Sequence, residues 1–133
     1  MSRLTVFLAR LIGLFTILLV VGFLLRGSAI IEVTIADRPV MLTYAIISLA
    51  TGLAMVLGHN VWSGGAVPVV VTLFGWLILA KGLLLLFLTP EALTPLLRRM
   101  QYGEHMYLYL MPWLVIGIYL TWAGFAAPPR RGV

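Results

Sequence analysis

Apolar residues occur along this chain in four long runs separated by short polar stretches. The runs cover residues 4–25, 40–58, 66–88 and 106–126. A helix needs about 20 apolar residues to cross the hydrocarbon core, and inside lipid it satisfies its own backbone hydrogen bonds. The pattern therefore predicts one transmembrane domain over residues 1–133, an all-α integral membrane four-helix bundle with short loops.

The connection between the first two runs carries its own signals. In residues 26–39, Val33 and Ile35 alternate with polar neighbours, which predicts an extended segment at the membrane interface. Asp37 is expected to cap the second helix, with Pro39 in its first turn.

The connection between the third and fourth runs predicts a short interfacial helix over residues 95–102. Each of the pairs Thr89-Pro90 and Thr94-Pro95 has the form of a helix cap followed by a first helical residue. In such a helix apolar side chains enter the lipid while basic ones reach phosphates. The apolar residues are Leu96, Leu97 and Met100, and the basic ones are Arg98 and Arg99.

Composition agrees with a membrane protein and excludes several classes. Hydrophobic residues make up 62% of the chain and charged residues 10%, whereas a soluble domain is about 45–50% apolar and about 25% charged. The first run is too long for the h-region of a cleaved signal peptide. No cysteine is present, which excludes disulfides, cysteine–zinc sites, iron–sulfur clusters and thiol catalysis.

The distribution of charge bears on orientation. Four spans place both termini on one side, and all four acidic residues fall on the other side. The basic leader of the first span favours both termini in the cytoplasm. Arg98 and Arg99 favour the opposite orientation, because anionic headgroups attract basic helices on the cytoplasmic face.

Two basic residues interrupt the apolar runs. Lys81 lies about 10 Å inside the third span at 1.5 Å per residue, where a lysine costs ~2.5–3.5 kcal/mol on insertion scales. No span contains an acidic residue. Lys81 either extends to the interface or meets a lipid phosphate, Glu91, Glu104 or an acidic group of another subunit. Arg10, two turns inside its span, is expected to reach lipid phosphates.

One side of the second span is polar or small. Its members at helical spacing are Tyr44, Ser48, Thr51, Gly52, Met55 and His59. Ser48 and Gly52 form a small-xxx-small pair that allows another helix to approach closely. This face is either a helix–helix seam or a polar lane that binds a ligand.

The sequence offers little for catalysis or cofactors. Proton-coupled carriers place carboxylates or histidines along their path, and no span here contains Asp or Glu. His59 ends the second span and His105 begins the fourth, on opposite sides of the membrane and about 30 Å apart. One chain therefore cannot hold a heme between them. His59 and Asn60 are instead expected to satisfy open carbonyls at the helix end. We expect no enzyme, metal or cofactor.

Residues 58–90, GHNVWSGGAVPVVVTLFGWLILAKGLLLLFLTP, contain an H-N-x-W turn followed by a G-W-x-x-x-x-K-G helix. This stretch resembles an uncharacterised family of small four-helix bacterial inner-membrane proteins. The resemblance makes Lys81 and the His59 turn the places to look for function. Its signature positions would be His59, Asn60, Trp62, Gly75, Trp76, Lys81 and Gly82.

These features favour a non-catalytic accessory, assembly or stabilising subunit of a larger bacterial membrane complex, or a homo-oligomer. Its partners would be membrane lipids and other membrane subunits, with no nucleic acid. A small transporter or channel for a lipid or anion, using Arg10 and Lys81, is the alternative. A pigment- or quinone-associated subunit is a third interpretation. The candidate contact residues are Lys81, Arg10, His59, Asn60, Trp62, Ser48, Gly52, Arg98 and Arg99.

Overall fold

The computed structural model describes residues 1–27, 29–101 and 104–126, and every regular element in that part of the chain is a helix. The elements are α1 (Arg3–Arg26), α2 (Ala29–Ala36), α3 (Arg38–Gly58), α4 (Ala66–Phe87), α5 (Pro90–Arg99) and α6 (Met106–Ala126). The predicted all-α class is confirmed.

Four of these helices are long and apolar enough to cross a membrane. They are α1, α3, α4 and α6, with 24, 21, 22 and 21 residues. Their bounds agree within two residues with the four apolar runs, and they indicate a multi-pass membrane protein.

The segment between α1 and α3 was predicted to be extended, and this was wrong. Residues 29–36 form helix α2. A lone strand at an interface has no neighbour for its backbone groups, whereas a helix satisfies them internally. The predicted start of α3 is correct, because the Asp37 carboxylate accepts from the Val40 N–H at 3.5 Å and Pro39 lies in the first turn.

Helix α5 forms as predicted in kind but begins five residues earlier than expected. Thr89 is its N-cap residue, and Pro95 lies inside the helix rather than at its start. The Thr89 carbonyl accepts from both Ala92 and Leu93 at 3.1 Å, so the first turn is complete before Pro95. The bond that Pro95 cannot donate would end on the carbonyl of Glu91, an exposed residue in the first turn of α5.

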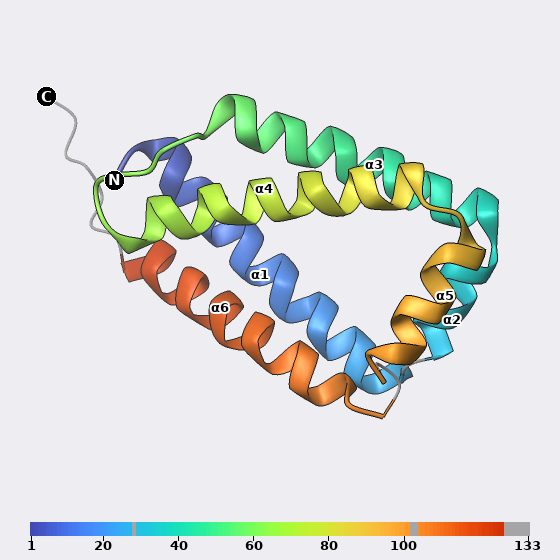
Figure 1. Cartoon of the computed structure of the whole chain (residues 1–133). Coiled ribbons are helices and arrows are strands. Elements are labelled where there is room, and N and C mark those ends of the chain that lie inside the picture. The colour runs from blue at the N-terminus through green and yellow to red at the C-terminus, as the bar shows by residue number, and fades with distance from the viewer. Residues whose placement is uncertain (28, 102–103, 127–133) are drawn as a thin grey trace, which may run out of the picture.

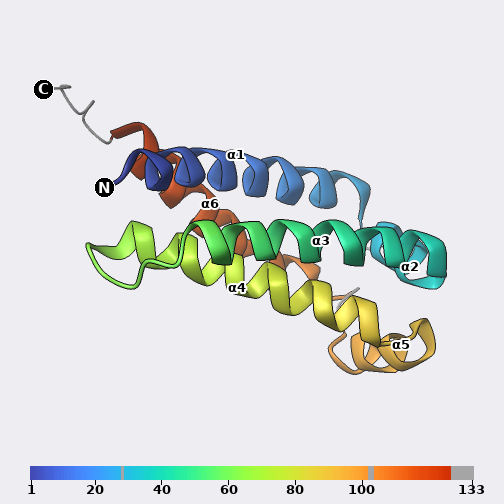
Figure 2. The same ribbon diagram turned by 90° about the horizontal axis from the view of Figure 1, so that it is seen from above.

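The spanning helices are arranged as two antiparallel pairs, α3 with α4 and α1 with α6 (Figure 1). Seen from above, α6 crosses α1, while α3 and α4 run side by side (Figure 2). The beginning of α1, the 59–65 turn and the end of α6 lie together at what we call the terminal end. Helices α2 and α5 lie across the opposite end, the far end (Figure 1).

Glycines allow close contact within each pair. A Cβ added at Gly52 would lie 2.5 Å from the Leu79 Cα, and one at Gly82 would lie 2.6 Å from the Leu49 N. In the other pair, a Cβ at Gly13 would lie 2.6 Å from the Thr121 N. Both pairs therefore approach backbone to backbone, as small-residue interfaces in membranes do.

The core is shared by all four spans only toward the terminal end. The larger buried cluster there draws on each of them: Ala9, Ile12, Met55, Val67, Val71, Leu120 and Ala123. A second cluster lies toward the far end and comes from α1 and α6 alone: Val20, Met106 and Leu110. Between these levels, Phe74 of α4 meets Trp113 of α6 edge to face, with ring centroids 5.3 Å apart. The pairs are thus joined at the terminal end and have separate interiors beyond it.

Candidate functional site

His59, at the end of α3, is buried between two hydroxyl groups from other helices. Only 3% of the residue is exposed. Its Nε2 lies 2.9 Å from the Thr5 hydroxyl of α1, and its Nδ1 lies 3.3 Å from the Thr72 hydroxyl of α4. One side chain therefore connects three of the four spans.

The neighbours of these hydroxyls assign the protons on a neutral ring. Thr72 accepts from the Val61 N–H at 3.0 Å, and its single hydrogen can go to the Val61 carbonyl at 3.0 Å. Thr72 then accepts from His59 Nδ1–H, which leaves Nε2 to accept from Thr5. The Thr5 oxygen in turn can accept from the Ser2 hydroxyl at 2.7 Å. Both ring nitrogens of His59 and the hydroxyls of Thr5 and Thr72 thus have hydrogen-bond partners, which is typical of a structural histidine.

The predicted role of this turn was only partly correct: the backbone N–H of His59 donates to the open Met55 carbonyl at 2.7 Å, but the side chains have other partners. The His59 imidazole bonds hydroxyls, and it is the Thr72 hydroxyl that lies 3.4 Å from the His59 carbonyl. Asn60 does not reach a carbonyl either, because its Oδ1 accepts from two indoles. The donors are Trp62 at 2.7 Å and Trp76 at 3.5 Å. The H-N-x-W turn and the G-W start of the helix motif thus meet in space.

Arg10, which we expected to reach lipid phosphates, also has partners within the protein. Its Nε donates to the Gly124 carbonyl at 2.8 Å, and its guanidinium carbon lies 4.7 Å from the centroid of the Phe125 ring. The Gly124 carbonyl is one of the last four of α6, which have no partner within the helix. Arg10 therefore caps the end of α6 and fixes it to α1.

The predicted polar face of α3 divides into two faces. Ser48, Gly52, Met55 and His59 are buried, and the contacts of Gly52 with Leu79 show that this side is a seam with α4. Tyr44 and Thr51, which we placed on the same face, are exposed on the outer side of α3. Helical spacing alone grouped these two residues with the buried ones because the seam with α4 and the outer side of α3 are adjacent on the helix.

Lys81 is exposed and takes no part in the contacts that Gly52 and Gly82 make between α3 and α4. Within the described residues, no hydrogen bond or ion pair engages it. Neither acidic residue considered from the sequence, Glu91 or Glu104, folds back to it. Three interpretations of Lys81 remain: its side chain extends to the interface, it pairs with a lipid phosphate, or it pairs with an acidic group of another subunit.

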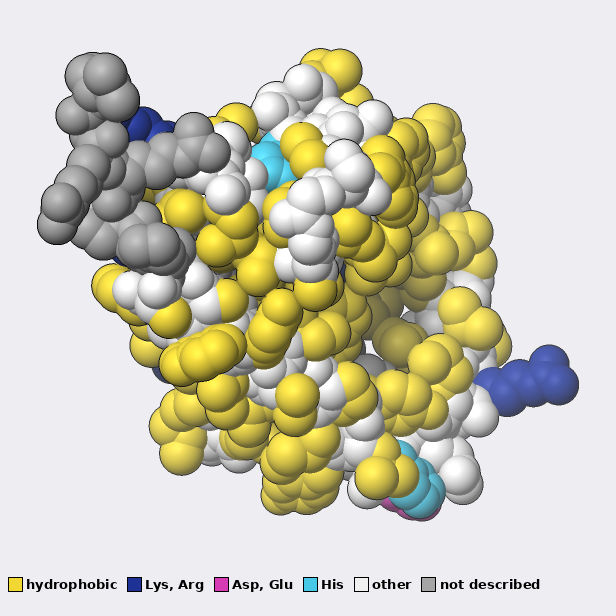
Figure 3. Space-filling model, turned by 90° about the vertical axis from the view of Figure 1, so that its left-hand side faces the viewer, with side chains coloured by type: hydrophobic (Ala, Val, Ile, Leu, Met, Phe, Trp, Pro, Cys, Tyr) yellow, Lys and Arg dark blue, Asp and Glu magenta, His cyan; other side chains and the backbone are white. Residues whose placement is uncertain are grey.

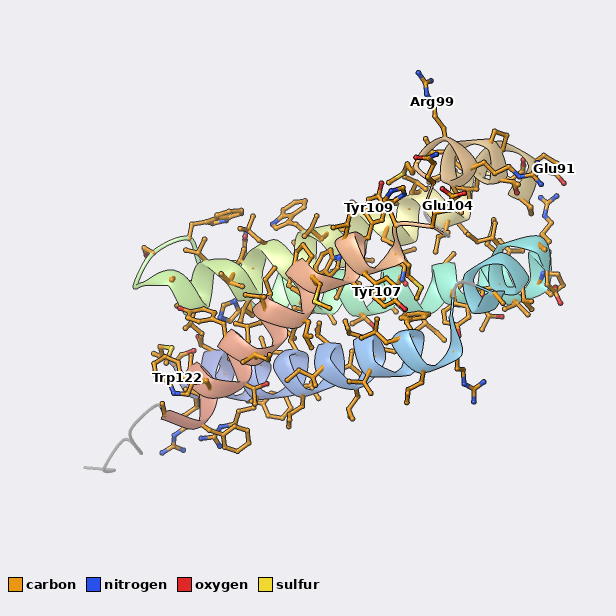
Figure 4. The ribbon with its side chains drawn as sticks, turned by 90° about the horizontal axis from the view of Figure 1, so that it is seen from below. Glu91, Arg99, Glu104, Tyr107, Tyr109 and Trp122 are labelled. Atoms are coloured by element: carbon orange, nitrogen blue, oxygen red, sulfur yellow. The ribbon has the colours of Figure 1, made fainter. Side chains whose placement is uncertain are left out.

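Helix α5 presents its basic residues away from the bundle. Arg98 and Arg99 are exposed in its last turn, Arg99 points outward (Figure 4), and Leu93 on the opposite side is buried. At its other end, hydrogen bonds from the Glu91 backbone N–H and the Thr89 hydroxyl hold the pKa of Glu91 below its usual range, with a smaller contribution from Arg38. Leu96 and Met100 are exposed as predicted, and Leu97 is half-buried.

Tyr109 fixes the start of α6 to the end of α5. Its hydroxyl donates to the Met100 carbonyl at 2.9 Å, and Figure 4 shows the side chain on the same side of α6 as α5. The far end of α6 is therefore held against α5 rather than against α3.

The part of the chain that the structure describes contains no group of three or more His, Asp or Glu side chains arranged to hold a metal. Comparison with known proteins identifies no relative: no family model, no curated protein and no solved structure matches this chain.

Sequence reasoning missed Thr5 and Thr72 as partners of His59. Their signal was present, because each lies on the small-residue stripe of its own helix, with Ala9 and Gly13 in α1 and with Gly75 in α4. A polar residue on such a stripe faces another helix. The sequence alone did not show which one.

Proposed function

We propose that this protein is a non-catalytic accessory, assembly or stabilising subunit of a larger complex in the bacterial inner membrane, or a homo-oligomer, with both termini in the cytoplasm. The observation that supports the proposal is an outer stripe on α3. Its members, spaced three and four residues apart, are Tyr44, Ile47, Thr51, Ala54 and Gly58.

This outer α3 stripe has the composition of a helix interface, but none of the described helices packs on it. All five residues are exposed, and a Cβ added at Gly58 would meet nothing within 4 Å. Ala54 and Gly58 form a small-xxx-small pair, and Tyr44 and Thr51 place hydroxyl groups beside it. In membranes, small residues and hydroxyls are enriched where helices associate.

The other small-residue stripes of the described spans already have partners. Gly13 and Gly117 lie in the contact of α1 with α6, and Gly52 and Gly82 lie in the contact of α3 with α4. Without a partner the outer α3 stripe would face lipid, which packs against large side chains as well as it does against Ala54 and Gly58. A spanning helix of another subunit, or of a second copy, fits it better.

Replacement of Ala54 by leucine tests the proposal. The variant should fold, because Ala54 is exposed, but it should lose its partner because the added side chain separates the two helices. In mild detergent, light scattering should give the wild type a protein mass above the 14.7 kDa of one chain. Ala54→Leu should weaken association about tenfold or more, a change of ~1.4 kcal/mol.

Ala80→Leu is the matched control, because Ala80 is an exposed alanine of α4 outside the stripe. It should assemble like the wild type. A wild-type protein that is a single chain in mild detergent and in membrane-derived nanodiscs, without copurifying subunits, would refute the proposal. So would equal assembly of both variants and the wild type.

Transport of a lipid or an anion is the second candidate, and Lys81 is the observation that favours it. An exposed cation within a span and without an ion pair among the described residues suits an anionic substrate. Flux of that substrate through reconstituted liposomes, abolished by Lys81→Ala, would support transport. Absence of flux with the wild type would exclude transport and leave the accessory role as the remaining candidate.

A further inference from the structure

Lys81 continues the stripe of α4 that packs against α1 and α6. The residues of this stripe, in steps of three and four, are Val67, Val71, Phe74, Ile78, Lys81 and Leu85. Val67 and Val71 are buried in the shared core, and Phe74 and Ile78 are half-buried against it. Lys81 lies seven residues, or two turns, after Phe74 and so on the same side of the helix. Its position on the helix is therefore on the side turned toward the α1–α6 pair.

At the level of Lys81 the two pairs have moved apart. Phe74 still meets Trp113 of α6, but the next cluster toward the far end contains residues of α1 and α6 only. In Figure 1 the pairs diverge from the terminal end, and α5 lies across the wide end. The space-filling surface seen from the terminal end is hollowed on one side (Figure 3). Lys81 lies on the side of α4 that is turned toward this space, and it is exposed.

The opening lies within the membrane, so apolar material must fill it. Lys81 is six residues before the end of α4, which places its Cα about 9 Å inside the span. Side chains of a helix lean toward its N-terminus, and for α4 that is the terminal end. The side chain therefore leans away from the nearer boundary, which makes extension to the interface less favourable. An ammonium group in this position needs an anion.

No span supplies such an anion, because none contains Asp or Glu. All four acidic residues lie in or beside α2 and α5, outside the spans. The nearest source of both an apolar filling and a negative charge is a molecule that carries both. A phospholipid with a net negative charge meets these conditions, because its acyl chain fills the opening and its phosphate pairs with the ammonium group.

We infer that the opening between the helix pairs is a binding site for one anionic phospholipid, with an acyl chain between α4 and α6 and the phosphate on Lys81. The site goes beyond the proposed function, since it lies inside one chain and away from the outer α3 stripe. Trp113 marks its inner limit and α5 its outer limit.

Native mass spectrometry of delipidated protein, titrated with phosphatidylglycerol or with phosphatidylcholine, tests the inference. The wild type should hold one phosphatidylglycerol about tenfold more tightly than phosphatidylcholine. Lys81→Met should remove this preference, and Lys81→Arg should keep most of it because the charge remains. Arg99→Met, which removes an exposed cation outside the opening, should bind like the wild type.

Several results would overturn the inference. They are equal retention of phosphatidylglycerol by Lys81→Met, equal affinity for both lipids, an equal loss in Arg99→Met, and retention of a fatty acid in place of the phospholipid. A copurifying protein lost specifically from Lys81→Met would also overturn it, because a partner's carboxylate would then be the anion. Ala54→Leu separates the two proposals. It should retain the lipid even as a single chain.

Discussion

At the residue scale, His59 shows how a polar side chain can join the helices of a membrane bundle through hydrogen bonds. A buried imidazole needs a donor and an acceptor, and Thr5 and Thr72 supply both because hydroxyl groups can act in either role. The same turn places Asn60 between two indoles at the surface. The turn is therefore bonded to the bundle interior through His59 and to two surface indoles through Asn60.

Replacement of His59 by alanine should lower the free energy of unfolding by about 2–3 kcal/mol, because two buried hydroxyls lose a partner and the ring leaves a void. The measurement is denaturation in mixed micelles followed by circular dichroism. His105→Ala is the control, since His105 is exposed at the far end and should change stability little. Equal stability of the His59 variant and the wild type would contradict a structural role.

At the element scale, the backbone contacts of the glycines decide which helices pair. Leu49 of α3 contacts Gly82 of α4, and Leu79 of α4 contacts Gly52 of α3, so the two contacts are reciprocal. Such contacts leave no room for a side chain. The α1–α6 pair follows the same rule through Gly13 and adds the bond from Arg10 to the end of α6.

Gly82→Ala should destabilise the protein by about 1–3 kcal/mol, because the new Cβ would lie 2.6 Å from the Leu49 N and the two backbones would have to separate. Gly22→Ala makes the same chemical change in α1, where nothing lies within 4 Å, and should cost nothing. Thermal denaturation in one detergent compares the two variants. If both behave alike, the α3–α4 distance is not set at Gly82.

The sequence predicted the spans well because hydrocarbon thickness fixes their length. It did not predict the pairing of α1 with α6, since helices that are apolar on every side give little directional signal. It failed at α2, where a short alternation around Val33 was outweighed by the backbone's need for hydrogen bonds. It found His59 but not its partners, because Thr5 is 54 residues away and Thr72 is 13.

At the scale of the whole molecule, the two ends differ in chemistry. The terminal end joins all four spans through the shared core and carries Arg3 and Arg10, whereas all four acidic residues lie at the far end. The far end is covered by α2 and α5 and contains the opening beside Lys81. The four spans are therefore joined at one end and form separate pairs toward the other.

The proposed orientation places the terminal end in the cytoplasm, and the absence of native cysteines allows a direct test. Ser63→Cys marks the 59–65 turn, and Arg99→Cys marks α5; both positions are exposed. In intact spheroplasts an impermeant maleimide should label Arg99→Cys at once and Ser63→Cys only after the membrane is opened. The reverse pattern would place the termini in the periplasm.

The pairing of the first spanning helix with the last has a consequence for biosynthesis. Helices α3 and α4 are joined by a seven-residue turn and can dock as soon as both have entered the bilayer. Helix α1 must wait, with its glycine face bare, until α6, which is translated after the other three spans, leaves the ribosome. We expect a chain cut short before α6 to remain open to degradation by membrane proteases, so that only finished copies persist.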